Sequence, residues 1–317
     1  MGRTVASAPV EDLADELRLA LAQVWDDDVR VDGLRRLSGG ATSETWSFDA
    51  LRADASVAHL VLRRTRGQAV DEGALLRAAA AAGVPVPGVV AAVDGGLVVE
   101  RIEGETIPRR ILREESLAAA RTRLAAQCGI ILGRLHRIPT DAVPGLERPD
   151  PLPTWQGMLD GLAQPHPAFE LALLWLREHQ PPSSATTVVH GDFRNGNLVV
   201  GPEGVRAVLD WELAHLGDPM EDLGWLCVKA WRFGVNDKRV GGFGEEADLF
   251  TAYESAGGKT VDPGVVRWWE VLGTLKWGIM CIVQAVTHLS GATRSVELAA
   301  IGRRVCENEW DLLELIE

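Results

Sequence analysis

Several features that mark particular classes of protein are scarce in this sequence. Only 4 of its 317 residues are cysteines, and none forms a Cys-x-x-Cys pair. We therefore expect neither a zinc site nor a disulfide framework, and we interpret the thiols as reduced core residues of a cytoplasmic protein. No uninterrupted apolar run reaches the ~18 residues that a membrane span needs. Residues 1–10 contain an arginine and no apolar stretch, so no secretory signal is expected.

Positive charge is scarce as well. Lysine and arginine number 32 against 45 aspartates and glutamates, which gives a formal net charge of -13. Nucleic acid is bound through a basic surface, so this balance argues against a nucleic-acid partner. Tyrosine occurs once, whereas tryptophan occurs 11 times. Six tryptophans gather in one C-terminal stretch, which favours a bulky helical core, with a wall for stacking a base or acyl chain as the alternative: Trp211, Trp225, Trp231, Trp268, Trp269 and Trp277.

Two familiar glycine-rich nucleotide-binding motifs are missing. Residues 258–260 (Gly-Lys-Thr) end like a P-loop, but Tyr253 stands where that motif needs its first glycine, and a helical pattern precedes it. Residues 242–247 match a dinucleotide fingerprint but lack a preceding strand and a surrounding β-α-β unit. Neither segment therefore predicts a P-loop or Rossmann-type site.

The hydrophobic pattern changes near residue 103. Before it, alternating runs predict short strands with one inserted helix, and after it the helical period dominates. We therefore predict a two-lobed α+β protein, with a small β-rich lobe at 1–103 and a larger helical lobe at 104–317. Strands are expected at 34–37, 45–48, 59–63, 89–93 and 97–99, and helices at 10–25, 71–82, 116–137, 154–180, 265–289 and 297–316.

Residues 188–212 hold the densest group of polar side chains. Two apolar runs flank a Gly-Pro-Glu-Gly turn at 201–204, a pattern typical of a β-hairpin. Pairing of Val200 with Val205 would set its register, and the residues that precede and follow the two strands would then meet at one open end.

This register brings three oxygen-bearing side chains to one edge. Asn197 and Asp210 lie near the open end of the hairpin, and Asp192 lies on the loop that leads into it. A carboxylate beside an amide oxygen suits Mg²⁺. Phosphoryl transfer needs such ligands together with a group that orients the attacking hydroxyl. We therefore predict Asp192 as the catalytic base and Asn197 and Asp210 as metal ligands, with turn-forming and capping residues as the alternative.

The same strings carry a family resemblance. His-Gly-Asp-Phe-Arg-Asn-Gly-Asn at 190–197, followed by Leu-Asp-Trp-Glu at 209–212 and Gly-Asp-Pro at 217–219, resembles the aminoglycoside phosphotransferase family, relatives of the protein kinases. The string at 208–219 resembles the branch that includes the kinase modules associated with acyl-CoA dehydrogenases. The resemblance extends from about Leu37 to the end. It implies a protein-kinase-like fold with ATP between the two lobes.

The resemblance also implies roles for individual residues. Arg194 would join Asp192 as a catalytic residue near the γ-phosphate. Arg63 takes the place of the usual nucleotide-phosphate lysine, and Glu72 matches its ion-pair partner. The remaining nucleotide contacts are implied at the hinge and in the loop that replaces the glycine-rich loop: Glu100, Ile102, Gly39, Gly40 and Ser43. Glu212 would add a metal contact.

Two polar residues of the motif are interpreted as structural. His190 is expected to bond a nearby backbone group or Asp218, and Asp218 is expected to anchor the loop after the hairpin.

Together these features predict an ATP- and Mg²⁺-dependent kinase that phosphorylates a hydroxyl of a small molecule. The string at 208–219 favours a hydroxyacyl-CoA or related metabolite, with Trp231 or Trp277 along its acyl chain. Candidate contacts to the CoA phosphates are Lys229, Arg232, Lys238, Arg239 and Lys276. An aminoglycoside is the alternative acceptor. A catalytically silent nucleotide-binding pseudokinase is the alternative of another class, because Arg63 replaces lysine and the glycine loop is short.

Overall fold

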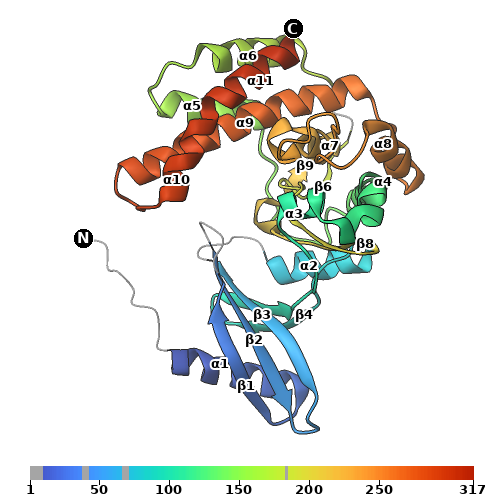
Figure 1. The fold of residues 1–317 in the computed structure, drawn as a ribbon, viewed down its shortest axis with the longest axis vertical. Helices are drawn as coiled ribbons and strands as arrows, with labels where there is room; N and C mark the ends of the chain where they lie inside the picture. The colour runs from blue at the N-terminus through green and yellow to red at the C-terminus, as the bar shows by residue number, and fades with distance from the viewer. Residues whose placement is uncertain (1–9, 38–42, 66–70, 183–184) are drawn as a thin grey trace.

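The computed structural model describes residues 10–37, 43–65, 71–182 and 185–317. A small, mainly β part and a larger, mainly helical part lie at opposite ends of the molecule (Figure 1). The predicted α+β class is confirmed, and the predicted division after residue 103 lies in the segment between the last strand of the sheet and the next helix. Gly39 and Gly40 lie outside the described residues, as does the side chain of Ser43.

The N-terminal part is an antiparallel sheet covered by one helix. Its strands follow the order β1-β2-β3-β5-β4. Helix α1 (Val10–Trp25) packs Leu13, Leu17 and Leu21, which repeat every four residues, against Phe48 and Leu60 of the sheet. The strands are β1 (Val29–Arg36), β2 (Ser43–Arg52), β3 (Val57–Thr65), β4 (Val89–Val93) and β5 (Gly96–Glu100).

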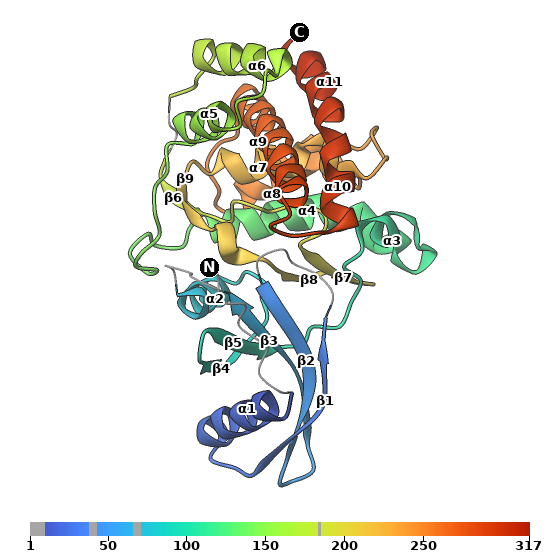
Figure 2. The same ribbon diagram turned by 90° about the vertical axis from the view of Figure 1, so that its left-hand side faces the viewer.

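Helix α2 (Glu72–Ala81) connects the two parts. Asp71 caps it by accepting a hydrogen bond from the Ala74 amide at 2.9 Å. Leu75 and Leu76 join the hydrophobic core of the helical part rather than the core beneath α1. The first turn of α2, which carries Glu72, is therefore held at the junction of the two parts (Figure 2).

The helical part is built around the long helix α9 (Pro263–Leu289), which packs against α5, α6, α7, α10 and α11. Helix α8 packs closely against α4, because Gly129 and Gly133 of α4 face it. A Cβ at Gly129 would lie 2.3 Å from the carbonyl oxygen of Leu249. The remaining helices are α3 (Pro108–Arg113), α4 (Ala118–Leu135), α5 (Pro151–Gly161), α6 (Pro167–Glu178), α7 (Met220–Cys227), α8 (Glu246–Ser255), α10 (Val296–Ile301) and α11 (Val305–Ile316).

Three sequence predictions need correction, two about helices and one about a cysteine. The helix predicted at 154–180 is two helices, α5 and α6, because Pro165 and Pro167 cannot continue a helix. The helix predicted at 297–316 is interrupted by a short 3-10 turn at Gly302–Arg304. Cys306 is exposed rather than a core residue.

Helix α9 also bears on the expectation that no segment spans a membrane. By length and composition it is apolar enough to cross one, and it is the single such helix among the described residues. However, 61% of its most apolar stretch is buried inside the protein. This burial is typical of a core helix, and it agrees with the interpretation of the clustered tryptophans as core, since Trp268 and Trp269 of α9 are both buried.

Candidate active site

The loop at 190–197 leaves strand β6 (Thr187–Val189) and is fixed by a buried carboxylate. Asp222 of α7, 0% exposed, accepts hydrogen bonds from the amides of His190 at 2.8 Å and Gly191 at 2.9 Å. It also contacts Nε2 of His136 at 3.1 Å. Gly191 has φ +75, and a Cβ there would lie 2.4 Å from the carbonyl oxygen of Leu213, so only glycine fits.

The side chain of His190 bonds backbone groups, which was the first of the two predicted alternatives. Nε2 donates to the carbonyl oxygen of Leu209 at 3.0 Å, and Nδ1 accepts from the amide of Asp192 at 3.2 Å. Burial lowers the pKa of His190, in agreement with a neutral ring that donates through one nitrogen and accepts through the other. The backbone amide of His190 contacts Asp222, and Asp218 accepts from the amide of Met220 at 2.9 Å.

The carboxylate of Asp192 is held by three side-chain donors. Oδ1 accepts from Nε of Arg194 at 3.0 Å and from Nε1 of Trp225 at 2.8 Å. Oδ2 accepts from Nδ2 of Asn197 at 2.7 Å. These contacts fix the rotamer of Asp192, the group that the sequence predicts as the catalytic base.

The hairpin has the predicted register. Strands β7 (Leu198–Gly201) and β8 (Gly204–Val208) pair Val200 with Val205. Beyond the strands, the amide of Leu209 donates to the carbonyl oxygen of Asn197 at 2.8 Å. Asn197 and Asp210 therefore lie at the same open end. Asp210 has φ 60, in the left-handed region that Asp and Asn tolerate better than most residues.

Arg63 connects this end of the hairpin to the N-terminal part. Its Nη1 lies 2.9 Å from Glu72 Oε1, which confirms the predicted ion pair, and its Nη2 donates to Asp210 Oδ1 at 3.0 Å. Burial raises the pKa of Glu72, and the charge of Arg63 opposes that shift. The contact between Arg63 and Asp210 could not be predicted from the sequence, because the two residues are far apart in the chain.

A cavity of about 240 Å³ lies where the sheet meets the hairpin. Arg63 and Asp210 line it, together with Glu100 and Ile102 of the predicted hinge. The amide of Ile102 donates to no group in the described part of the chain. The other walls are largely apolar and include Val61, Leu76, Pro87, Val99, Val199, Val208, Leu209 and Trp211. An apolar slot with a free backbone donor and an arginine at its end suits a flat base joined to phosphates.

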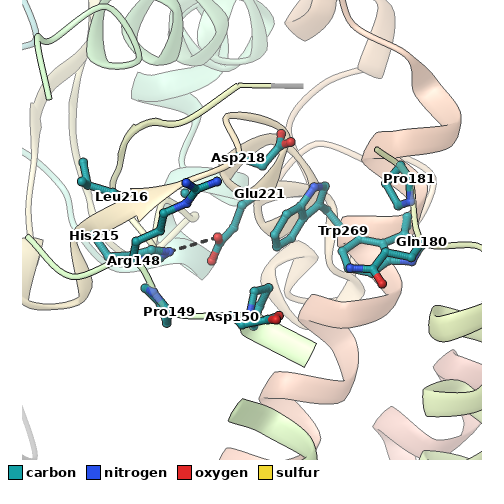
Figure 3. A pocket seen from close by; sticks show the side chains of 13 residues that line it. Arg148, Pro149, Asp150, Gln180, Pro181, His215, Leu216, Asp218, Glu221 and Trp269 are labelled. Atoms are coloured by element: carbon teal, nitrogen blue, oxygen red, sulfur yellow. Dashed lines mark hydrogen bonds and ion pairs between the residues drawn. The ribbon is translucent and has the colours of Figure 1, made fainter. Parts of the chain in front are cut away.

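Two further cavities are lined in part by the segment 211–221 that follows the hairpin. One, of about 470 Å³, is lined by Leu75, Trp155, Trp211, Met280 and Lys276, among others. The second, of about 360 Å³, shares His215 and Glu221 with the first. Figure 3 shows this second cavity, with the contact between His215 Nε2 and Glu221 Oε2 at 3.1 Å, and with Arg148 and Trp269 along its walls.

The residues present fit a magnesium ion that also binds phosphate. No three His, Cys, Asp or Glu side chains in the described ranges gather into a metal cage. Asn197 uses its Nδ2 on Asp192, which leaves its amide oxygen, and Arg63 engages only Oδ1 of Asp210. One carboxylate and one amide oxygen match the few protein ligands that Mg²⁺ takes when phosphates supply others.

Comparison with known proteins identifies the family and the fold. The sequence model of the phosphotransferase enzyme family matches residues 33–258. The chain belongs to this family. A crystal structure of a candidate aminoglycoside phosphotransferase from Ralstonia eutropha has a TM-score of 0.76, at 22% identity over 97% of this chain and 98% of that one. A spectinomycin phosphotransferase in complex with ADP and spectinomycin has a TM-score of 0.66, at 14% identity over 99% and 98%.

The curated relatives share part of their length with this phosphotransferase. Acyl-CoA dehydrogenase family member 10 of Mus musculus is 33% identical over 170 residues, 49% of this chain. The aligned region is 16% of that relative, so the chain corresponds to a small portion of it. The predicted family and the kinase-like fold are thus confirmed.

Not every predicted contact is found. Four proposed contacts to CoA phosphates are already ion-paired: Lys229 with Asp311 and Glu314, Arg232 with Glu270, Lys238 with Glu245, and Arg239 with Glu246 and Glu270. Because acidic partners neutralise them, they do not form a free basic rim, and that prediction is wrong. Trp231 and Trp277 do lie near the site, since Trp231 packs against both Trp225 and Trp277.

Proposed function

We propose that this phosphotransferase uses Mg-ATP to phosphorylate a hydroxyl group of a small molecule, and that the acceptor is a hydroxyacyl-CoA or a related metabolite. The observation that carries the proposal is the arrangement around Asp192. Its carboxylate is fixed by Asn197, Arg194 and Trp225. Asp210, at the hairpin end where Asn197 also lies, lines the apolar slot that suits a base, and Lys276, which donates to the carbonyl oxygen of Gly191, lines the cavity of about 470 Å³. A base fixed in this way can orient an acceptor hydroxyl towards a γ-phosphate.

Each residue has a defined task in this proposal. Asp192 accepts the hydrogen bond, and then the proton, of the acceptor hydroxyl. Arg63 contacts the α- or β-phosphate through its guanidinium, and Arg194 supplies positive charge near the transferred group. Asn197 and Asp210 would hold Mg²⁺, which neutralises phosphate charge when bound. The amide of Ile102 hydrogen-bonds the base at the hinge.

The acceptor cavity favours a chain with apolar character. Leu75, Trp155 and Met280 line it, and Lys276 is its buried cation. A polycationic aminoglycoside would be favoured by three or more unpaired carboxylates without a basic group. Four glutamates line the cavity, and two of them are paired, Glu72 with Arg63 and Glu221 with His215, which leaves fewer than three. This pairing supports the acyl acceptor over the aminoglycoside.

An ADP-release screen with Mg-ATP tests the function. Hydroxyacyl-CoA esters, aminoglycosides and amino alcohols serve as acceptors, and Asp192→Asn serves as the matched inactive control because it keeps the shape of the side chain. We expect ADP release that depends on a hydroxyacyl acceptor and is lost in the control. ADP release with aminoglycosides alone would show that the acceptor is an aminoglycoside and not a hydroxyacyl compound. Binding of ATP without transfer to any acceptor would favour the pseudokinase alternative.

A further inference from the structure

Lys276 is a buried cation beside the catalytic loop, and the proposed reaction does not yet use it. It lies on α9 and is 8% exposed. Its Nζ donates to the carbonyl oxygen of Gly191, the residue before Asp192, at 2.9 Å. The ammonium also lies 4.5 Å from the ring centroid of Trp225, whose Nε1 donates to Asp192. Lys276 is therefore coupled twice to the position of the proposed base.

The hydrogen-bonding capacity of Lys276 is only partly used. An ammonium has three donors, and the Gly191 carbonyl is its one hydrogen-bond acceptor in the described ranges. Its nearest carboxylate is Glu221, at 4.0 Å, which is too far for a hydrogen bond. Glu221 accepts instead from His215 at 3.1 Å. Lysine is rarely buried without full pairing, because desolvation of its charge is costly.

The remaining charges of the cavity lie elsewhere on its wall. Glu72 faces Arg63, while Glu147 and Glu212 are exposed. Two aromatic rings flank the ammonium itself, Trp225 and, at 5.7 Å, Trp155. The part of the cavity nearest the catalytic loop therefore holds an ammonium between two aromatic rings, with Glu221 4.0 Å away, whereas Glu147 and Glu212 lie towards solvent.

We propose that Lys276 binds a carbonyl or carboxylate oxygen of the acceptor and so selects hydroxy acids and their thioesters over amino alcohols. The inference rests on the proposed function, since it concerns the acceptor of the same reaction. If Lys276 holds one oxygen of the acceptor, the acyl chain can lie along Trp155 and Met280. The hydroxyl then remains free to reach Asp192. A cationic acceptor is disfavoured there, because its charge would meet an ammonium in a buried, low-dielectric setting.

An acceptor series with one chain length tests the selectivity. We choose γ-hydroxybutyrate, its primary amide, its CoA thioester and the amino alcohol of equal length, each measured by ADP release from Mg-ATP. We expect kcat/KM to be about tenfold or more higher for the three carbonyl compounds than for the amino alcohol, the size of one hydrogen bond to a charged group. A preference for the amino alcohol in the wild-type protein would overturn the proposal, whatever the variants do.

Lys276→Met then distinguishes a role of Lys276 in acceptor selection from a purely structural role. The methionine keeps most of the side-chain volume and removes the charge. We expect the preference for the carbonyl compounds over the amino alcohol to fall about tenfold or more, chiefly through KM. Lys259→Met removes the same charge from an exposed position and should leave the preference unchanged.

The alternative is that Lys276 only holds the Gly191 carbonyl. In that case kcat would fall equally for all four acceptors and the preference would stay, which would overturn the inference while leaving the proposed function intact. If no acceptor at all gives ADP release that depends on Asp192, the proposed function fails, and this inference fails with it. ATP binding by Lys276→Met, measured by calorimetry, should match the wild type, because Lys276 does not line the cavity that suits the base.

Discussion

Removal of the Asp222 carboxylate should destabilise the whole helical part as well as the catalytic loop. This fully buried side chain accepts the amides of His190 and Gly191 and contacts His136. In Asp222→Ala these donors lose their acceptor inside the protein, where no group in the described ranges replaces it. Hydrogen bonds to charged groups contribute roughly 1.5–3 kcal/mol each, but they are not additive. We therefore expect a loss of about 3–5 kcal/mol, as for a broken buried ion pair.

The pH dependence supplies an independent check on the same carboxylate. Burial alone would raise its pKa, but the contacts with His136 and His190 together outweigh burial, and the pKa of Asp222 is lowered from 3.8. A lowered pKa means that the stabilisation is complete above the unfolded value and is lost as the pH falls through the folded value. The difference in stability between wild type and Asp222→Ala should therefore shrink as the pH falls below about 4.

Urea denaturation followed by tryptophan fluorescence measures both effects. Asp141→Ala is a matched control, because Asp141 is exposed in a loop of the same part and should change stability by less than about 0.5 kcal/mol. A loss below about 1 kcal/mol in Asp222→Ala, or a difference from wild type that persists unchanged at low pH, would refute the assignment of Asp222 as the anchor of the loop.

Four further outcomes are expected. Asp192→Ala should lower turnover by about 100-fold or more with ATP binding retained, and near-normal turnover would exclude a base role. Asp210→Asn should raise the Mg²⁺ concentration for half-maximal rate, whereas an unchanged Mg²⁺ dependence would exclude it as a ligand. Arg63→Lys should weaken ATP binding modestly, as calorimetry can measure, because lysine keeps the positive charge but lacks the forked guanidinium. His215→Gln should reduce stability at about pH 6 more than at about pH 9. Burial lowers the pKa of His215, but the contact with Glu221 outweighs burial, and the pKa is raised above 6.5. The stabilisation that the charged ring provides is therefore lost as the pH rises.

Local patterns made the catalytic hairpin predictable. The register that brings Asn197 and Asp210 together depends on a four-residue turn and on the apolar runs that flank it, both of which the sequence shows directly. The same holds for α1, whose bounds match the apolar period. A division into α5 and α6 was less visible, because the apolar residues continue on both sides of Pro165.

Contacts between distant segments could not be predicted in the same way. Asp222 lies 31 positions after Gly191, in a helix whose place against the loop depends on the packing of α7 against α9. One available signal was its position just after Gly217-Asp218-Pro219, where a helix begins. Lys276 was predicted as one of five contacts to the CoA phosphates, yet it is buried beside the catalytic loop. Its surroundings come from three separate segments, which no local pattern describes.

The contacts of Arg63 between the two parts explain why an arginine suits position 63. Its two terminal nitrogens reach two carboxylates at once, Nη1 to Glu72 of α2 and Nη2 to Asp210 at the end of the hairpin. A lysine ammonium is a single point on a flexible stem, whereas the guanidinium is a rigid fork whose nitrogens point in different directions. One side chain can thus join the sheet, α2 and the hairpin around the cavity. A nucleotide bound there would compete with Asp210 for Nη2 while Nη1 stays with Glu72, so the fork can serve phosphate without releasing α2.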